Sequence, residues 1–261
     1  EKISLAYFNN IWHLPKNGAP STHILKPTRS DELSTIAHNE FFCMKLANKL
    51  KLPVPQTEIL ELDDLSVFVC QRYDRKLDFE KGTIQRIHQE DFCQALGIMN
   101  DIKYQADGGP SLKDCFNLIQ EKFSDNLEQI NIFLKSILFN YLIGNCDSHG
   151  KNFSLVFEDS KIKLSPLYDL VSTTVYPALT KKMAMKLGSN YEIEKITRND
   201  FAKQAELFEI KNRFWVNVME YFSKNLIPAF CEVSNMPEFS QCHELIELLH
   251  NQINTRLQVL L

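Results

Sequence analysis

The sequence FNYLIGNCDSHGKN, residues 139–152, is the most informative segment of the chain, because in it the predicted end of an apolar helix runs into a polar turn. The turn carries Asp147, His149, Lys151 and Asn152 within six residues. A carboxylate, an imidazole, an amine and an amide gathered in so short a turn can hold phosphate groups and metal ions. The rest of the chain is assigned around this candidate functional site.

The spacing in this turn predicts a particular chemistry. Asp147 precedes Asn152 by five positions, the offset between the catalytic aspartate and the metal-binding asparagine in the H-R-D-x-x-x-x-N loop of protein kinases. A second acidic residue, Asp169, follows a predicted short hairpin in the segment LSPLYDLVSTT. Phosphoryl transfer uses a carboxylate to orient the acceptor hydroxyl, an amide and a second carboxylate to hold magnesium, and cations around the phosphates. The sequence therefore predicts a phosphotransferase.

A purely structural explanation of the same turn stays open at this point. Isolated D-x-x-x-x-N patterns are mostly turn residues that cap their own backbone. A single loop histidine such as His149 more often bonds to backbone than takes part in catalysis. The order of helix, polar loop, hairpin and Asp169, with Lys151 inside the loop, favours the catalytic interpretation.

The composition is that of a globular protein without general affinity for polyanions. The chain has 261 residues, 44% of them hydrophobic and 24% charged, with a net charge of −4 and a pI near 6.0. This length suits one large domain or two lobes, and the charge gives no overall attraction to nucleic acid or anionic membrane. No apolar run approaches the ~20 residues of a membrane span, and no signal peptide is visible.

The cysteines and the first residues give two further expectations. Seven cysteines are scattered without any C-x-x-C spacing, which gives no support to zinc-ribbon or redox motifs. Most lie in apolar surroundings, as expected for small core residues of a soluble protein in a reducing, intracellular compartment. The chain begins at Glu1 inside a strand-like segment, EKISLAY, so we expect that a piece upstream is missing.

A lysine and a glutamate near the start of the chain are candidate partners. A strand is predicted over residues 22–26, and Lys26 ends it. A helix is predicted next, capped by Ser30 or Asp31, and Glu40 on this helix lies fourteen residues after Lys26. In protein kinases, a strand lysine reaches the ATP phosphates and pairs with a helix glutamate. The alternative is a lysine and a glutamate that are both solvated on the surface.

The segment SVFVCQRYDR, residues 66–75, is predicted to be a buried strand that enters a polar turn. In a kinase its end, Gln71–Arg72–Tyr73, would be the hinge that offers backbone N–H and C=O groups to adenine. A core strand followed by a simple turn fits the same residues.

The remaining segments are assigned mainly to helices. Residues 88–91, H-Q-E-D, contain candidate metal ligands but no second histidine at helical spacing, so we predict a helix start with Asp91 at its positive end. Amphipathic helices are predicted over 115–123 and 127–143, and the second would support the turn described above. From Arg198 onward the pattern is helical.

Several long blocks of the sequence also match one known family in its order. They are THILK, NEFFCMKLANKLKLPVP, VCQRYDR, RIHQEDFCQALG, KYQADGGPS, LFNYLIGNCDSHGKNFSLV and LSPLYDLVSTTVYP. With these blocks, which run over nearly the whole chain, the sequence resembles the HipA family of bacterial Ser/Thr kinases, the toxins of type II toxin–antitoxin systems. The resemblance implies an α+β, two-lobed protein-kinase-like fold, with a small β-rich N-lobe over residues 1–72 and a large, mainly helical C-lobe over residues 73–261.

By position, the resemblance implies a role for each candidate residue. Asp147 would be the catalytic base, with Lys151 and Asn152 beside it in the catalytic set. Mg²⁺ would be held by Asn152 and Asp169. The residues that would contact ATP are Lys26, Glu40, Gln71, Arg72, Tyr73, His149, Lys151, Tyr168 and Asp169.

The resemblance also implies a reaction and partners. The γ-phosphoryl group of ATP would pass to a Ser or Thr hydroxyl of a protein, with an aminoacyl-tRNA synthetase as the expected target and inhibition of translation as the result. A HipB-like antitoxin and a small HipS-like subunit are the expected partners, with DNA contacted only through the antitoxin and no membrane involved. The implied location is the bacterial cytoplasm, and secretion into a host stays open.

The sequence departs from the family pattern in three ways. The phosphate loop that precedes the EKISL strand in the family is not in this sequence, where Gly18 is the only glycine before Gly82, so no autophosphorylation site is assigned. The N-terminal subdomain of larger HipA proteins is also absent, which fits a short HipT-like toxin or a truncated HipA. A lysine-rich stretch that some members use at DNA reads KLGSNYEIEKI here.

Two other functions stay open. The chain could be a catalytically silent, partner-binding subunit of a toxin–antitoxin complex, or a small-molecule phosphotransferase on the same fold. The intact set of Lys26, Asp147, Asn152 and Asp169 argues against the first. The HipA-like blocks outside the catalytic loop argue against the second.

Overall fold

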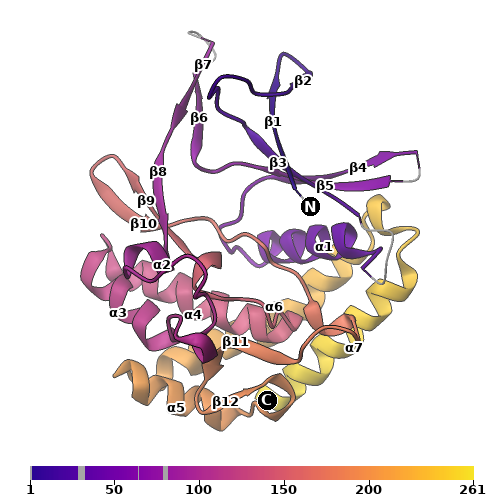
Figure 1. Cartoon of the computed structure of the whole chain (residues 1–261). Coiled ribbons are helices and arrows are strands. Elements are labelled where there is room, and N and C mark those ends of the chain that lie inside the picture. The colour runs from indigo at the N-terminus through magenta and orange to yellow at the C-terminus, as the bar shows by residue number, and fades with distance from the viewer. Residues whose placement is uncertain (1, 29–32, 64, 79–81) are drawn as a thin grey trace.

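The first part of the chain forms a five-stranded antiparallel sheet in the computed structural model, which describes residues 2–28, 33–63, 65–78 and 82–261 (Figure 1). Lys26 pairs in register with Phe68 of the neighbouring strand. Because cross-strand partners share a face of the sheet, Lys26 lies on the same side as the buried Phe68. The strand order is β2-β1-β3-β5-β4, with bounds β1 Ile3–Phe8, β2 Ile11–His13, β3 His23–Pro27, β4 Thr57–Leu62 and β5 Leu65–Gln71.

Helix α1 (Ile36–Lys49) lies beneath that face of the sheet (Figure 1). Its apolar side chains belong to the same buried cluster as Phe68. On its other side α1 packs against α6 (Arg213–Ser234), where the rings of Phe42 and Phe230 lie 4.9 Å apart between centroids. The helix is therefore held between the sheet and the helical part of the molecule.

The start of α1 bears on the site because two of its polar side chains are buried. Asn39 and Glu40 are 0% and 6% exposed, and each has partners from other elements, described below. The N-cap of the helix is Thr35. The two caps predicted from the sequence, Ser30 and Asp31, lie outside the described residues.

A second group of strands links the sheet to the helices. The residues H-Q-E-D form a strand, so the prediction that a helix starts there is wrong for His88 to Glu90. Asp91 nevertheless caps the short helix α2, because its Oδ1 accepts the N–H of Gln94 at 2.9 Å. The elements are the hairpin β6 Arg75–Asp78 and β7 Thr83–Arg86, the three-stranded sheet of β8 His88–Asp91, β9 Ser154–Glu158 and β10 Lys161–Leu164, and α2 Phe92–Ala95.

Helix α4 is the centre of the larger part of the chain. It contacts α3, α6 and α7 and ends at Ile143, with Gly144 as its C-cap, after which the polar turn begins. Its start, at Asn126, is one residue before the predicted one. The helices and the remaining hairpin are α3 Leu112–Lys122, α4 Asn126–Ile143, β11 Lys182–Leu187, β12 Asn190–Glu192, α5 Arg198–Phe208 and α7 His243–Leu260, with short 3₁₀ turns at Gln105–Asp107, Gly150–Asn152, Thr173–Val175, Ile193–Lys195 and Pro237–Phe239.

The core does not divide at the predicted lobe boundary. One cluster of buried apolar side chains extends from Phe68 and α1 to α7. This cluster does not mark where one lobe ends and the next begins, so the division into residues 1–72 and 73–261 stays a prediction. Within the described ranges, none of the helices combines the length and apolar character that crossing a bilayer requires.

Candidate active site

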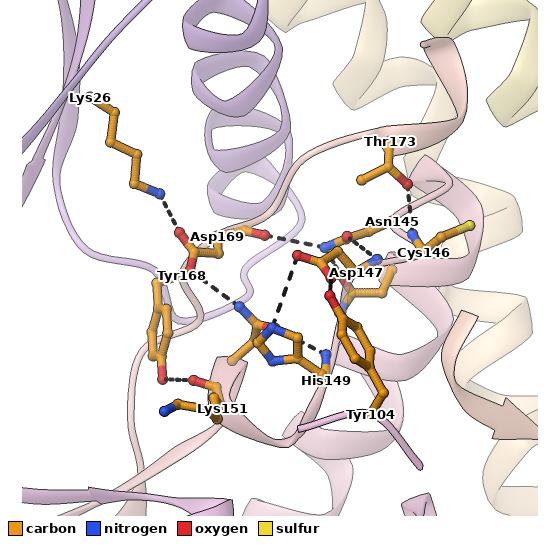
Figure 2. Close-up of polar contacts among 12 residues, drawn as sticks. Lys26, Tyr104, Asn145, Cys146, Asp147, His149, Lys151, Tyr168, Asp169 and Thr173 are labelled. Carbon is orange, nitrogen blue, oxygen red and sulfur yellow. Dashed lines mark hydrogen bonds and ion pairs between the residues drawn. The ribbon is translucent and has the colours of Figure 1, made fainter. Parts of the chain in front are cut away.

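The loop that follows α4 is fixed by the amide side chain of Asn145 (Figure 2). Asn145 Nδ2 donates to Asn140 Oδ1 at 2.8 Å and to the backbone oxygen of Asp169 at 3.2 Å. Asn145 Oδ1 accepts the backbone N–H of Asp147 at 3.1 Å. This one side chain therefore ties Asp147 to helix α4 and to the segment that carries Asp169.

Thr173 makes a second link between the same two segments. Its hydroxyl accepts the N–H of Cys146 at 2.9 Å and donates to the carbonyl of Gly144 at 3.1 Å. Because these groups are buried, leaving one unpaired would cost about 1–3 kcal/mol. The separation of Asp147 and Asp169 is thus set by a buried hydrogen-bond network.

Lys26 lies between two carboxylates. Its Nζ donates to Glu40 Oε1 at 2.7 Å and also to Asp169 Oδ1 (Figure 2). Burial alone would lower the pKa of Lys26, but the charges and hydrogen bonds of Glu40 and Asp169 raise it above its ordinary value. Lys26 is therefore a fixed cation that joins β3, α1 and the Asp169 segment.

Asp169 contacts a second site residue with its other oxygen. Asn152 Nδ2 donates to Asp169 Oδ2 at 3.2 Å, and Asn152 Oδ1 accepts the N–H of His149 at 3.0 Å. Burial alone would raise the pKa of Asp169, but the charge and hydrogen bond of Lys26 outweigh it and hold that pKa below its ordinary value. Asp169 therefore presents an ionised carboxylate next to the amide of Asn152.

The pair of Asn152 and Asp169 fits Mg²⁺, the metal that the resemblance implies. Mg²⁺ is usually bound through one or two carboxylates together with substrate phosphates, without a full cage of protein ligands. Across the described residues, no group of three or more His, Cys, Asp or Glu side chains is arranged to hold a metal ion. Asp169 Oδ2 and Asn152 Oδ1 are the oxygens that would bind the ion, with phosphate and water oxygens supplying the other ligands.

The carboxylate of Asp147 lies next to the phenol of Tyr104 and the imidazole of His149. Tyr104 donates its hydroxyl hydrogen bond to Asp147 Oδ1 at 2.7 Å, and His149 Nε2 lies 4.0 Å from Asp147 Oδ2 (Figure 2). The side chain of Asp147 is 52% exposed, whereas that of His149 is 8% exposed. Burial lowers the pKa of His149, because desolvation outweighs the attraction of Asp147. Asp147 is therefore the accessible carboxylate of the loop.

Lys151 and Tyr168 lie side by side at the cavity wall. Tyr168 donates from its hydroxyl to the carbonyl of Lys151 at 2.8 Å (Figure 2). The ammonium of Lys151 donates to Asn100 Oδ1 and lies 4.0 Å from an oxygen of Asp91. The ring of Tyr168 stacks on Tyr73, with 5.8 Å between centroids. Tyr168 therefore contacts both Lys151 and Tyr73 of the predicted hinge.

Two adjoining cavities contain all of the sequence-predicted site residues. The larger, about 600 Å³, is lined by the groups expected at phosphates and metal: Lys26, Glu40, Asp147, His149, Lys151, Asn152, Tyr168 and Asp169. The smaller, about 310 Å³, is lined by Gln71, Arg72 and Tyr73 and shares Lys26, Glu40, Tyr168 and Asp169 with the larger. The predicted site residues therefore line two cavities that meet at Lys26, Glu40, Tyr168 and Asp169.

The hinge prediction needs one correction. The N–H of Gln71 donates to the carbonyl of Gln56 at 2.9 Å, and the N–H of Arg72 donates to the carbonyl of Thr22 at 2.8 Å. Both amides are therefore already paired within the chain, and contacts to a base would come from other backbone groups. The guanidinium of Arg72 is bound by both oxygens of Asp74, at 2.9 and 2.7 Å.

Sequence reasoning missed four residues that organise the site. Tyr104, Asn145 and Thr173 lie in blocks that were identified from the sequence, but nothing in their spacing assigned a role to them. Asn39 precedes Glu40 on α1 and is bonded to the segment that follows Asp169. A polar residue on the buried face of an otherwise apolar helix, as Asn39 is, was the one available signal.

Comparisons with known proteins agree on one family. The HipA-like C-terminal domain matches residues 1–227. A Sinorhizobium fredii protein named "Putative kinase Y4mE" is 40% identical over 78% of this chain and 49% of its own length. The serine/threonine-protein kinase toxin HipA of Shewanella oneidensis is 26% identical over 89% of this chain and 55% of its own length. The chain thus spans about half the length of the curated relatives that it matches.

A solved structure agrees with the sequence matches. The complex of Shewanella oneidensis HipA with HipB and its operator DNA contains a chain that superposes with a TM-score of 0.91, covering 98% of this chain and 62% of that one at 24% identity. This likeness confirms the predicted α+β, kinase-like fold. One of the proteins similar to this chain is thus a serine/threonine-protein kinase toxin. Because the family model matches most of the chain, this chain belongs to the HipA-like C-terminal domain family.

Proposed function

We propose that this chain is the catalytic part of an ATP-dependent protein serine/threonine kinase toxin. The observation that carries the proposal is one cavity in which Lys26, Asp147, Asn152 and Asp169 meet from three separate parts of the chain. A fixed cation, an accessible carboxylate and an amide–carboxylate pair are the groups that phosphoryl transfer requires.

The two cavities suit the two ends of ATP. The adenine base fits the smaller cavity beside Gln71 and Tyr73, and the phosphates fit the larger one beside Lys26. Lys26 would bind phosphate oxygens while Glu40 holds its ammonium in place. Asn152 and Asp169 would hold Mg²⁺, which when bound neutralises charge on the phosphate oxygens.

Asp147 is the group for the acceptor side of the reaction. A Ser or Thr hydroxyl would donate its hydrogen bond to this carboxylate, which orients the oxygen towards the γ-phosphorus and takes up the proton. The bond from the acceptor oxygen to the γ-phosphorus forms as the bond to the β-phosphate oxygen breaks, and ADP leaves with that oxygen. Lys151 and His149 line the same cavity and would contact the transferred group there.

The biological setting is proposed from the relatives. Because the similar Shewanella protein is a kinase toxin seen with HipB and operator DNA, we infer a HipB-like antitoxin for this chain, with DNA reached through that partner. The family resemblance supports an aminoacyl-tRNA synthetase as the acceptor, with inhibition of translation as the effect. It also supports a small HipS-like subunit and a cytoplasmic location.

The test is transfer of the labelled γ-phosphate of ATP to proteins of a bacterial whole-cell extract. We expect a labelled protein band with the wild-type protein and none with Asp147→Ala, at unchanged thermal stability and ATP affinity. Asp101→Ala, which removes an exposed aspartate outside the loop, is the matched control and should label like the wild type. Near-wild-type labelling by Asp147→Ala would contradict the proposal.

The same experiment separates the alternatives. ATP and magnesium binding without labelling, even after addition of a small HipS-like subunit, would favour a catalytically silent, partner-binding subunit. Label that appears in small metabolites or antibiotics, and in no protein, would favour a small-molecule phosphotransferase.

A further inference from the structure

Among the described residues outside the predicted site set, Tyr104 is the one whose side chain is hydrogen-bonded to the carboxylate of Asp147. Its hydroxyl donates to Asp147 Oδ1 at 2.7 Å (Figure 2), and it lies 43 residues before that aspartate in the sequence. Its ring meets His149 edge-on, at 5.5 Å between centroids and 78° between planes. Tyr104 thus contacts both the carboxylate and the imidazole of the catalytic loop.

The backbone around Tyr104 is fixed by its own turn. The carbonyl of Tyr104 accepts the N–H of Asp107 at 3.0 Å and the N–H of Gly109 at 2.8 Å. A Cβ on Gly109 would lie 2.7 Å from the backbone of Lys103 and Tyr104, so the turn closes only with glycine there. This turn therefore holds Tyr104 in one orientation.

Two further contacts fix the turn to the rest of the domain. The side-chain oxygen of Gln105 accepts the N–H of Lys186 in β11 at 2.7 Å. The ring of Pro110 lies so close to Gly150 that no Cβ fits between them, and Gly150 begins the 3₁₀ turn that ends at Asn152. Tyr104 and the catalytic loop are therefore parts of one packed unit.

The two oxygens of Asp147 are unequal as a result. Oδ1 is occupied by the phenol, whereas Oδ2 lies 4.0 Å from His149 Nε2, beyond hydrogen-bond distance, at the wall of the larger cavity. A carboxylate with one oxygen held by a rigid donor has its plane and rotamer fixed. Positioning of this kind matters because an error of 1 Å at a reacting group can cost about 100-fold in rate.

We propose that Tyr104 is a positioning residue for phosphoryl transfer: its hydroxyl holds Asp147 through Oδ1, so that Oδ2 is the oxygen that binds the acceptor hydroxyl and takes its proton. This inference rests on the proposed kinase function. The opposite role is a phenol that mimics the acceptor hydroxyl and competes with it. The anchored turn favours positioning, because a competing group would have to move away in every turnover.

The ionisation of the phenol agrees with a donor role. Burial, together with the hydrogen bond and charge of Asp147, raises the pKa of Tyr104 to about 12. The hydroxyl therefore keeps its proton at neutral pH and donates a hydrogen bond to the carboxylate, and it does not take up the proton of the substrate.

The test compares Tyr104→Phe with Tyr221→Phe in steady-state transfer to dephosphorylated casein and to the bacterial extract. Tyr104→Phe keeps the ring on His149 and removes only the hydroxyl. Tyr221 donates an equally short hydrogen bond, 2.7 Å to the carbonyl of Leu50, away from the cavity, so Tyr221→Phe controls for the loss of a tyrosine hydrogen bond. We expect Tyr104→Phe to lower kcat roughly 10- to 100-fold with the KM for ATP changed less than about twofold. Tyr221→Phe should leave kcat unchanged.

Three outcomes would overturn the inference. Wild-type kcat in Tyr104→Phe would remove the positioning role, and a lower acceptor KM with unchanged or higher kcat would establish the competing role instead. A fall in kcat that is matched in Tyr221→Phe would mean a loss of stability only.

A second measurement does not depend on turnover. Ionised phenol absorbs at 295 nm. The absorbance of the wild type minus that of Tyr104→Phe follows Tyr104 alone, and so does the absorbance of Asp147→Ala minus that of the double variant Asp147→Ala, Tyr104→Phe. We expect Tyr104 to ionise at lower pH in Asp147→Ala than in the wild type. The same titration in both would mean that the two groups do not interact in solution, which overturns the inference. If this shift is present but the wild type labels no protein, the proposed function fails, and the positioning role fails with it.

Discussion

Asn39 and Ser172, 133 residues apart in the sequence, hold each other through two hydrogen bonds of 2.9 Å. Asn39 Nδ2 donates to the carbonyl of Ser172, and the N–H of Ser172 donates to Asn39 Oδ1. Asn39 precedes Glu40, and Ser172 follows Asp169 by three residues, so this pair joins the two elements whose carboxylates bind Lys26. The position of α1 and that of the Asp169 segment are therefore coupled.

Replacement of Asn39 should be severely destabilising. Asn39→Ala would leave two backbone groups of Ser172 buried without partners, and we expect a loss of about 2–4 kcal/mol in the free energy of unfolding. Urea unfolding followed by circular dichroism measures this loss. Asn48→Ala, at an exposed position of the same helix, is the control and should change stability by less than about 0.5 kcal/mol. Equal effects of the two substitutions would contradict the coupling.

Gly144 should tolerate no side chain, for two separable reasons. Its φ is +76°, and a Cβ would overlap Thr174 Oγ1 and Arg256 Nη1. Gly97 has a similar φ of +68° but open space around it, so Gly97→Ala should cost only the left-handed backbone strain of about 1–2 kcal/mol. Gly144→Ala should cost more than Gly97→Ala in urea unfolding and should also weaken turnover, because residues 145–147 follow directly. If Gly144→Ala and Gly97→Ala lowered the free energy of unfolding equally, the side chains of Thr174 and Arg256 would be moving aside without destabilising the fold, which would contradict this prediction.

Asp169 should be required for magnesium-dependent binding of ATP. The residue has a φ of +54°, a conformation that asparagine tolerates, so Asp169→Asn removes the charge with little backbone strain. We expect calorimetry to give a roughly 10- to 100-fold weaker affinity for ATP with Mg²⁺, and a much smaller change without it. Asp159→Asn, at a φ of +49° in a hairpin turn, is the control. Wild-type affinity in Asp169→Asn would remove its role at the metal.

Glu40 should make stability depend on pH. Burial outweighs the attraction of Lys26 and raises the pKa of Glu40 from 4.5 to about 7. The folded protein therefore binds this proton more tightly than the unfolded chain, so the contribution is complete below pH 4.5 and is lost as pH rises through about 7. Its size is at most about 3 kcal/mol.

The matched control for this pH dependence is Glu40→Gln, which cannot titrate. His149, whose pKa is lowered by burial, changes stability in the opposite direction but is present in both proteins. The unfolding free energy of the wild type relative to Glu40→Gln should fall between pH 5 and pH 8. A difference that stays constant with pH would contradict the raised pKa.

The local part of the site could be predicted from the sequence because its chemistry lies in one turn. Asp147, Lys151 and Asn152 fall within six residues, and their spacing alone restricts which groups can face one ligand. The strand before Lys26 and the helix that carries Glu40 were also visible as periodic patterns. By contrast, the residues H-Q-E-D were assigned to a helix start and form a strand, because pairing with β9 outweighed the local signal at His88 to Glu90.

The family, the kinase-like fold class and the candidate reacting groups can therefore be predicted from the sequence alone. Three contacts of the site depend on the tertiary fold: Lys26 binds Asp169, Asn39 binds Ser172, and Tyr104 binds Asp147. The physical reason is that hydrogen bonds and ion pairs act over about 3 Å, whereas these partners lie from 43 to 143 residues apart. Their meeting depends on the packing of the whole core, which no local pattern of residues specifies.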